Sequence, residues 1–144
     1  MARDIVKGFL NRAAVSLRVI TDPSLNIGAD QLGEEMITFA PQGRASDMLP
    51  TATGLVASPV PYMVISISFK LVKTSTVCQL YLNKLGSRTF FGDVEITPDA
   101  SSLDKITIKN VMLATVESVA FSGKDPAVGF TLEGYLPINN DLFG

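Results

Sequence analysis

Residues 62–72 read YMVISISFKLV, and this stretch decides the fold class. Apolar side chains recur at every second position, at Met63, Ile65, Ile67, Phe69 and Leu71. Successive side chains of a strand point to opposite sides, so this period of two predicts a long β-strand with one buried and one solvated face. The solvated face carries small hydroxyls and one cation, at Ser66, Ser68 and Lys70.

Similar patterns predict further strands on both sides of this stretch. Residues 13–20 and 34–40 precede it, and residues 87–97 and 127–136 follow it, with Gly92 as a possible bulge. Residues 104–121 predict either two strands or one bent strand. Residues 1–12 carry Ile5, Val6, Phe9 and Leu10 near helical spacing, which suggests a short amphipathic turn or an arm that docks on a neighbour.

A helix is predicted between the long strand and residue 87. Thr74 or Ser75 could cap its start, and Gly86 could end it. Its apolar residues follow helical spacing, which predicts one stripe packed on a sheet, formed by Val77, Leu80, Tyr81 and Leu85. Together these elements predict a mainly β domain, a β-sandwich or a partly open β-barrel, with one flanking α-helix.

Residues 41–61 are rich in proline, glycine, serine, threonine and alanine. A segment this long with little regular pattern is uncommon in a compact domain and usually has a function or is disordered. We expect a projecting loop or hairpin that contacts a neighbouring subunit, and a mobile surface loop is the alternative. The candidate contact residues are Arg44, Asp47, Met48, Leu49 and Leu55.

The composition fits one domain of 144 residues, 1–144, and favours self-association. Charged residues make up 18% of the chain and hydrophobic residues 47%. Such a chain is either an unusually apolar monomer or a protein whose surface is covered by copies of itself, and the second is the expectation. The net charge of −2 gives no basic face for specific nucleic-acid binding.

Catalytic chemistry has few candidate groups here. The chain has no histidine and one cysteine, Cys78, which removes the usual general base and thiolate-rich metal sites. Glu34 and Glu35 are adjacent, so on a strand they would point to opposite faces. We therefore expect neither an enzyme nor a cofactor or metal site, and Cys78 is expected to be a core thiol. The start of the chain predicts no secretory signal, and residues 60–72 are too short and polar to span a bilayer.

The order of elements and the C-terminal meander ITIKNVMLATVESVAFSGKDPAVGFTLEGYL (residues 106–136) resemble the tail tube proteins of contractile phages and the tube proteins of type VI secretion systems. The resemblance covers most of the chain as an order of elements and contains no signature residue. It implies stacked hexameric rings, whose inner sheets merge into one barrel around double-stranded DNA. It also implies a tape-measure protein in the lumen during assembly, a sheath outside, baseplate proteins at the end, and a virion location after assembly in the host cytoplasm.

Simple geometry supports such a channel. Four strands from each of six copies, about 4.8 Å apart, give a circumference of roughly 115 Å and a diameter near 37 Å before tilt. That width admits a duplex, and a lumen with few cations would not hold its phosphates. The Ser66, Ser68 and Lys70 face suits such a lumen, although it could also be an ordinary solvated face.

Two other functions fit the same sequence. A baseplate or tube-initiating subunit of the same fold would form one ring and stop. A small-ligand carrier would need an apolar cavity inside a closed barrel, lined by the long alternating strand.

Overall fold

The computed structural model describes residues 8–143, apart from the side chains of Glu34, Glu35 and Phe143. Ile5 and Val6 of the predicted N-terminal turn or arm lie outside the described residues, whereas Phe9 and Leu10 lie within them, exposed and outside any helix. The chain is mainly β, with 49% strand and 18% helix, and its sheet curls into a half-barrel beside the helix of residues 76–87. The predicted fold class is confirmed, in the form of the partly open barrel.

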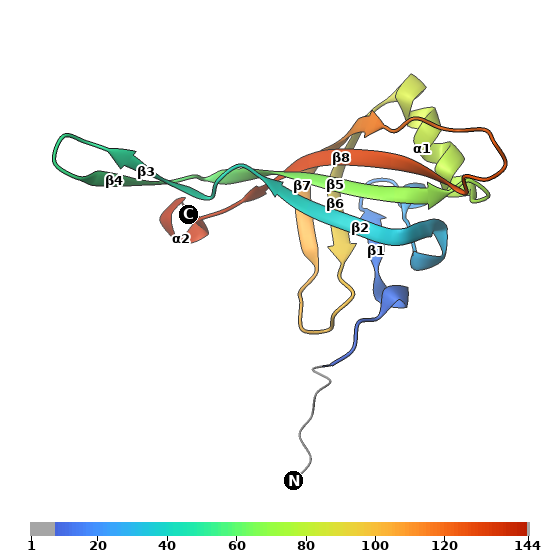
Figure 1. Cartoon of the computed structure of the whole chain (residues 1–144), viewed down its shortest axis with the longest axis horizontal. Coiled ribbons are helices and arrows are strands. Elements are labelled where there is room, and N and C mark those ends of the chain that lie inside the picture. Colours follow the sequence, from blue (N-terminus) through green and yellow to red (C-terminus); the bar gives the residue numbers. More distant parts are fainter. Residues whose placement is uncertain (1–7, 144) are drawn as a thin grey trace, which may run out of the picture.

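Within residues 8–143, a six-stranded antiparallel sheet has the order β1-β6-β7-β8-β5-β2, and β3 and β4 form a separate hairpin (Figure 1). The sheet strands are β1 (Ser16–Val19), β2 (Leu32–Gln42), β5 (Tyr62–Val72), β6 (Phe90–Thr97), β7 (Ile106–Val116) and β8 (Ala127–Pro137). The helical elements are η1 (Arg12–Ala14), η2 (Pro23–Leu25), η3 (Ala29–Gln31), α1 (Thr76–Ser87) and α2 (Asn140–Phe143).

Strand β5 has the bounds that its alternation predicts, and it lies between β2 and β8. Ile65, Ile67, Phe69 and Leu71 are buried on the concave face of the sheet, whereas Lys70 is exposed on the other face. Each such buried side chain contributes about 1.5–3 kcal/mol of apolar burial. The inward side chains of β5 therefore form one side of the hydrophobic core.

Helix α1 covers part of this concave face and brings a tyrosine into the core. The Tyr81 ring meets Phe69 and Phe91 edge to face, with centroids 5.7 and 5.5 Å away, and Phe130 at 5.6 Å. Edge-to-face contacts place the positive ring edge against the negative face of its neighbour. Side chains from α1, β5, β6 and β8 thus meet in one aromatic cluster.

The predicted helix differs from α1 in detail. The helix passes through Gly86 and ends at Ser87, so the prediction that Gly86 ends it is wrong. Val77, Cys78 and Tyr81 form its buried stripe, whereas Leu80 and Leu85 are exposed. The reason is that a helix at the side of a curled sheet contacts it along a narrow stripe.

Two glycines allow bulges that shape the half-barrel. Gly92 has a φ of +85°, and the β6–β7 register shifts on both sides of it, which agrees with the predicted bulge. Gly134 on β8 faces the bulge in β7 where Asn110 has a φ of +49°. A β-carbon on Gly134 would lie only 2.6 Å from the Ile108 methyl carbon and 2.9 Å from the Lys109 carbonyl oxygen. The bulged backbone can approach β8 because this side chain is missing.

Strand β7 is one strand with bulges, so residues 104–121 do not form two strands. The segment from Glu117 to Pro126 is a longer connection than the tight turn expected at residues 122–126.

Residues 41–61 contain the hairpin of β3 (Ser46–Pro50) and β4 (Leu55–Pro59). Figure 1 shows the hairpin extending beyond the end of the sheet, on the side away from α1. Proline, glycine and serine in this segment lie at the strand ends and in the turn, which explains why the sequence shows no regular pattern.

Candidate functional site

The first candidate surface is the sheet face opposite the core. Ser66 and Ser68 lie on it half-buried, and Lys70 lies on it exposed, as the alternation of β5 predicts. The neighbouring strands extend this face. Thr38 on β2, Ser68 on β5, Thr131 on β8 and Thr115 on β7 are successive cross-strand partners. A row of four hydroxyl side chains therefore crosses four strands at one level.

Charges of both signs lie on this outer face. Glu133 on β8 is exposed and pairs in register with Ser66, and Lys70 lies further along β5. Gly129, the cross-strand partner of Lys70, is covered by the side chain of Glu117. Sequence reasoning named the cation but not Glu133, although the alternation of residues 127–136 places Glu133 on one face with Thr131. The face is thus close to neutral, with small polar groups.

The part of the outer face nearer the hairpin is apolar. Tyr62, Val64 and Met112 are 57%, 40% and 47% exposed there. Together with Tyr135 and Glu133 they line a shallow depression of about 490 Å³. The hydroxyl-rich area therefore covers only part of the face.

The second candidate surface is the hairpin. Met48, Leu49, Leu55 and Val56 are 61%, 48%, 64% and 52% exposed, so four large apolar side chains contact solvent. Arg44 Nε lies 3.2 Å from Asp47 Oδ1 in an ion pair at the base of the hairpin. Both side chains are exposed, and such a pair contributes little to stability. The five predicted contact residues all lie in or next to this hairpin.

A residue from the far end of the chain fixes the base of the hairpin. The Asn139 side-chain amide donates hydrogen bonds to the Val60 carbonyl at 2.7 Å and to the Ala45 carbonyl at 3.2 Å. The Val60 amide also donates to the Ala45 carbonyl, at 3.0 Å. Asn139 has a φ of +55°, a conformation that asparagine tolerates better than most residues. Sequence reasoning missed this contact, because residues 45 and 139 are far apart in the chain.

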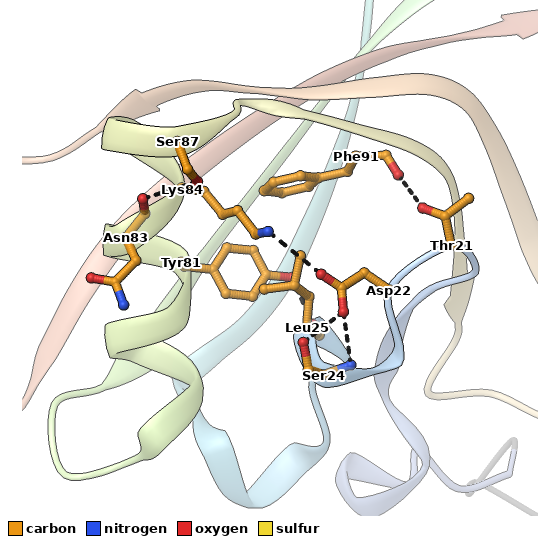
Figure 2. Close-up of polar contacts among 9 residues, drawn as sticks. All are labelled: Thr21, Asp22, Ser24, Leu25, Tyr81, Asn83, Lys84, Ser87 and Phe91. Atoms are coloured by element: carbon orange, nitrogen blue, oxygen red, sulfur yellow. Dashed lines mark hydrogen bonds and ion pairs between the residues drawn. The ribbon is translucent and has the colours of Figure 1, made fainter.

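Polar contacts beside the core hold η2 against α1 and β6 (Figure 2). The Tyr81 hydroxyl donates to the Leu25 carbonyl at 2.8 Å, and the Thr21 hydroxyl donates to the Phe91 carbonyl at 2.7 Å. Asp22 accepts a hydrogen bond from the Ser24 hydroxyl and lies 3.5 Å from the Lys84 amine. The Ser24 hydrogen bond is the main reason that the pKa of Asp22 is lowered. These groups are all occupied in joining three elements.

Other titratable groups of the described residues form ion pairs between β7, its preceding turn and β6, namely Lys105 with Glu95 and Lys109 with Asp93. Among the described residues, no cluster of three or more acidic, cysteine or histidine side chains could hold a metal ion. Cys78 is buried, and burial raises the pKa of its thiol. The side chains of Glu34 and Glu35 lie outside the described residues. The described part of the chain also contains no helix with the length and apolar character needed to cross a membrane.

No family model matches the chain, and none of the curated proteins matches its sequence. The outer sheet face and the hairpin are therefore interpreted from their geometry and chemistry alone.

Proposed function

We propose that this chain is the structural subunit of a phage tail tube, which forms stacked hexameric rings with a lumen that conducts double-stranded DNA. The observation that carries the proposal is the combination of an outer sheet face that a row of hydroxyl groups crosses with an exposed apolar hairpin. β7, β8, β5 and β2 are consecutive in the sheet and each spans 11 residues. Four adjacent strands of equal length suit the wall of a channel.

The strands can curve around a central axis as well as around their own core. A twisted sheet is saddle-shaped, so it is concave along one diagonal and convex along the other. Its outer face can therefore curve around the axis of a tube while its inner face curves around the core. Four strands from each of six copies give at least about 37 Å of backbone diameter, and a strand tilt near 40° widens this to roughly 48 Å. Side chains on the wall still leave space for a duplex about 20 Å wide.

The chemistry of the outer face also suits transit. DNA binding strengthens with each phosphate that a cation neutralises, so a conduit needs few cations. The row of Thr38, Ser68, Thr131 and Thr115 offers neutral hydroxyls, and Lys70 is accompanied by the anionic Glu133. DNA would therefore meet a weakly attractive wall.

A small-ligand carrier fits the packing less well. It would require the inward side chains of β5 to line an apolar cavity, but Phe69 stacks on Phe130 at 6.0 Å and meets the Tyr81 edge. The buried side of this strand is filled by the aromatic cluster.

Negative-stain electron microscopy of the purified chain tests the assembly. Stacked rings with a central channel are expected for a tube protein. Single rings alone would favour the tube initiator, and monomers at high concentration would reject both. Deletion of residues 44–57 should leave a folded monomer that no longer polymerises, and normal tubes from this variant would reject the role of the hairpin.

A charge variant tests the lumen assignment separately. The double variant Ser66→Lys/Ser68→Lys would add about twelve cations per ring, so its assembled tubes should retain DNA at low salt and release it as salt rises. The matched control is Ser101→Lys/Ser102→Lys, two exposed serines between β6 and β7. Equal DNA retention by the two variants would show that the outer face of β5 does not line the channel.

A further inference from the structure

The half-barrel has an open edge at β2. Strand β1, at the other end of the sheet, is capped, because Leu17 exchanges two backbone hydrogen bonds with Ile27, at 2.9 and 2.8 Å. In the described part of the chain, β2 pairs with β5 alone. Residues 37–40 of β2 contain neither charge nor proline, and they lie between a bulge at Met36 and Pro41. Open edges of this kind are templates for pairing with another strand.

An apolar groove lies beside this edge. It has a volume of about 590 Å³. Its lining includes Met36, Ile37 and Phe39 from β2, and Ile96, Leu103 and Ile106 from the facing wall of β6, β7 and their connection. Ile37, Phe39 and Ile106 pack against the core but stay partly exposed, because no strand among residues 8–143 closes the barrel at this point.

The hairpin offers a surface with matching properties. Met48 pairs with Ala57 and Pro50 pairs with Leu55, so these four apolar residues share one face of the hairpin. Its strands pair with each other only, within the residues that the structure describes, so the hairpin has unpaired edges as well. One apolar face and a free strand edge are what a strand added to β2 would need.

The hairpin cannot enter the groove of its own chain. Figure 1 shows that it extends past the end of the sheet, whereas the groove residues lie along the middle of β2 and beside the β6–β7 connection. Hydrogen bonds from Asn139 to the Val60 and Ala45 carbonyls hold the base of the hairpin in this extended direction. A hairpin in the groove must therefore come from another copy.

We propose that the β3–β4 hairpin of one copy binds in the groove beside β2 of the next copy, where it extends the sheet from residues 37–40 and buries Met48 and Leu55. The inference rests on the proposed function in requiring self-assembly, and it deepens that function by naming the two surfaces that meet. They are different patches of one chain, so the contact is heterologous and can be repeated around a ring or along a tube.

Disulfide trapping tests this contact. In a Cys78→Ala background, the pair Leu55→Cys and Leu103→Cys places one thiol on the hairpin and one on the exposed part of the groove. Mild oxidation of assembled protein should produce a ladder of covalent oligomers at least tenfold faster than the control pair Leu55→Cys and Phe121→Cys. Phe121 is 92% exposed but lies outside the groove.

The possible results separate this inference from the proposed function. Rings that form normally but crosslink no faster than the control would overturn the docking site and leave the tube function standing. A wild-type chain that stays monomeric, together with a Leu55→Cys/Leu103→Cys variant that gives no ladder, would overturn both.

A mixing experiment checks the same contact without crosslinking. Met48→Glu/Leu55→Glu disables the hairpin. Leu10 and Leu103 both line the groove and are exposed, so Leu10→Glu/Leu103→Glu disables the groove. Each variant alone should lose the contact while keeping a wild-type circular dichroism spectrum. A 1:1 mixture retains one intact hairpin and one intact groove, and should form a species of twice the monomer mass by light scattering. A mixture that contains monomers only would contradict the proposal.

Discussion

Replacing Tyr81 with phenylalanine removes one hydroxyl from the middle of the fold and leaves its ring in place. The Tyr81 side chain is fully buried, and its hydroxyl donates to the Leu25 carbonyl at 2.8 Å. The three aromatic contacts of the ring involve no hydroxyl. The substitution therefore isolates the hydrogen bond that joins α1 to η2.

The expected cost is about 2 kcal/mol at neutral pH, because the Leu25 carbonyl loses its partner in a buried site. An unfolding entropy of about 2.1 cal/mol/K per residue gives roughly 0.3 kcal/mol/K for this chain, so the melting temperature should fall by about 7 °C. Urea titration and thermal melts, followed by circular dichroism at one fixed protein concentration, measure both quantities.

The difference in folding stability between the wild-type protein and Tyr81→Phe should decrease as the pH rises above 10. Burial, followed by the Asp22 carboxylate, raises the pKa of Tyr81 above its ordinary value of 10.0. Above pH 10 the unfolded wild-type chain releases this proton and the folded chain does not, so folding stability falls with pH. The slope is about 1.4 kcal/mol per pH unit, and the phenylalanine variant lacks this contribution. The 2 kcal/mol difference between the two proteins should therefore disappear near pH 11.5.

The matched control is Tyr62→Phe, because Tyr62 is 57% exposed on the outer face. Its free energy of unfolding should change by less than about 0.5 kcal/mol. If Tyr81→Phe were as stable as Tyr62→Phe, or if the wild-type and Tyr81→Phe curves stayed parallel above pH 10, the buried hydrogen bond would not hold η2 as described.

Two further changes probe the bulge and the hairpin. Gly134→Ala should cost about 1–3 kcal/mol, since the new methyl group would overlap with β7, whereas Gly54→Ala in open space should change stability by less than about 0.5 kcal/mol in the same urea titration. Asn139→Ala removes two hydrogen bonds at about 1 kcal/mol each, so trypsin should cleave after Arg44 at least roughly tenfold faster than in the control Asn140→Ala. An unchanged cleavage rate would mean that the amide does not fix the hairpin.

Long alternating segments could be predicted from the sequence, and the errors arise where a bulge changes the count. The bounds of β5 agree with the prediction, because eleven residues with a strict period of two favour one conformation. The strand pattern of residues 87–97 predicts Phe90, Val94 and Ile96 as its buried residues. The bulge at Gly92 adds a residue, so Phe91 is buried and Phe90 is 46% exposed. Gly92 could be recognised as a bulge candidate, but its effect on the face of its neighbours could not.

The surfaces were predicted less completely than the strands, for a physical reason. Ser66, Ser68 and Lys70 could be grouped because one strand places them on one face. The remainder of the row, such as Thr131, depends on register across strands. The contact of Asn139 with the base of the hairpin depends on tertiary structure, and no local pattern in residues 137–144 indicates it.

The many apolar side chains of the sequence lie partly in the core and partly on the surface of the molecule. A ligand carrier would place them around an internal cavity, but the inward side of β5 and β8 is filled by the cluster of Tyr81, Phe69 and Phe130. Large apolar side chains are instead exposed on the hairpin, on the outer face near Tyr62 and beside the groove at Leu103. Exposed apolar area of this kind favours burial against another surface. Since the hairpin and the groove complement each other on one chain, a second copy is the partner that the surface chemistry supports best.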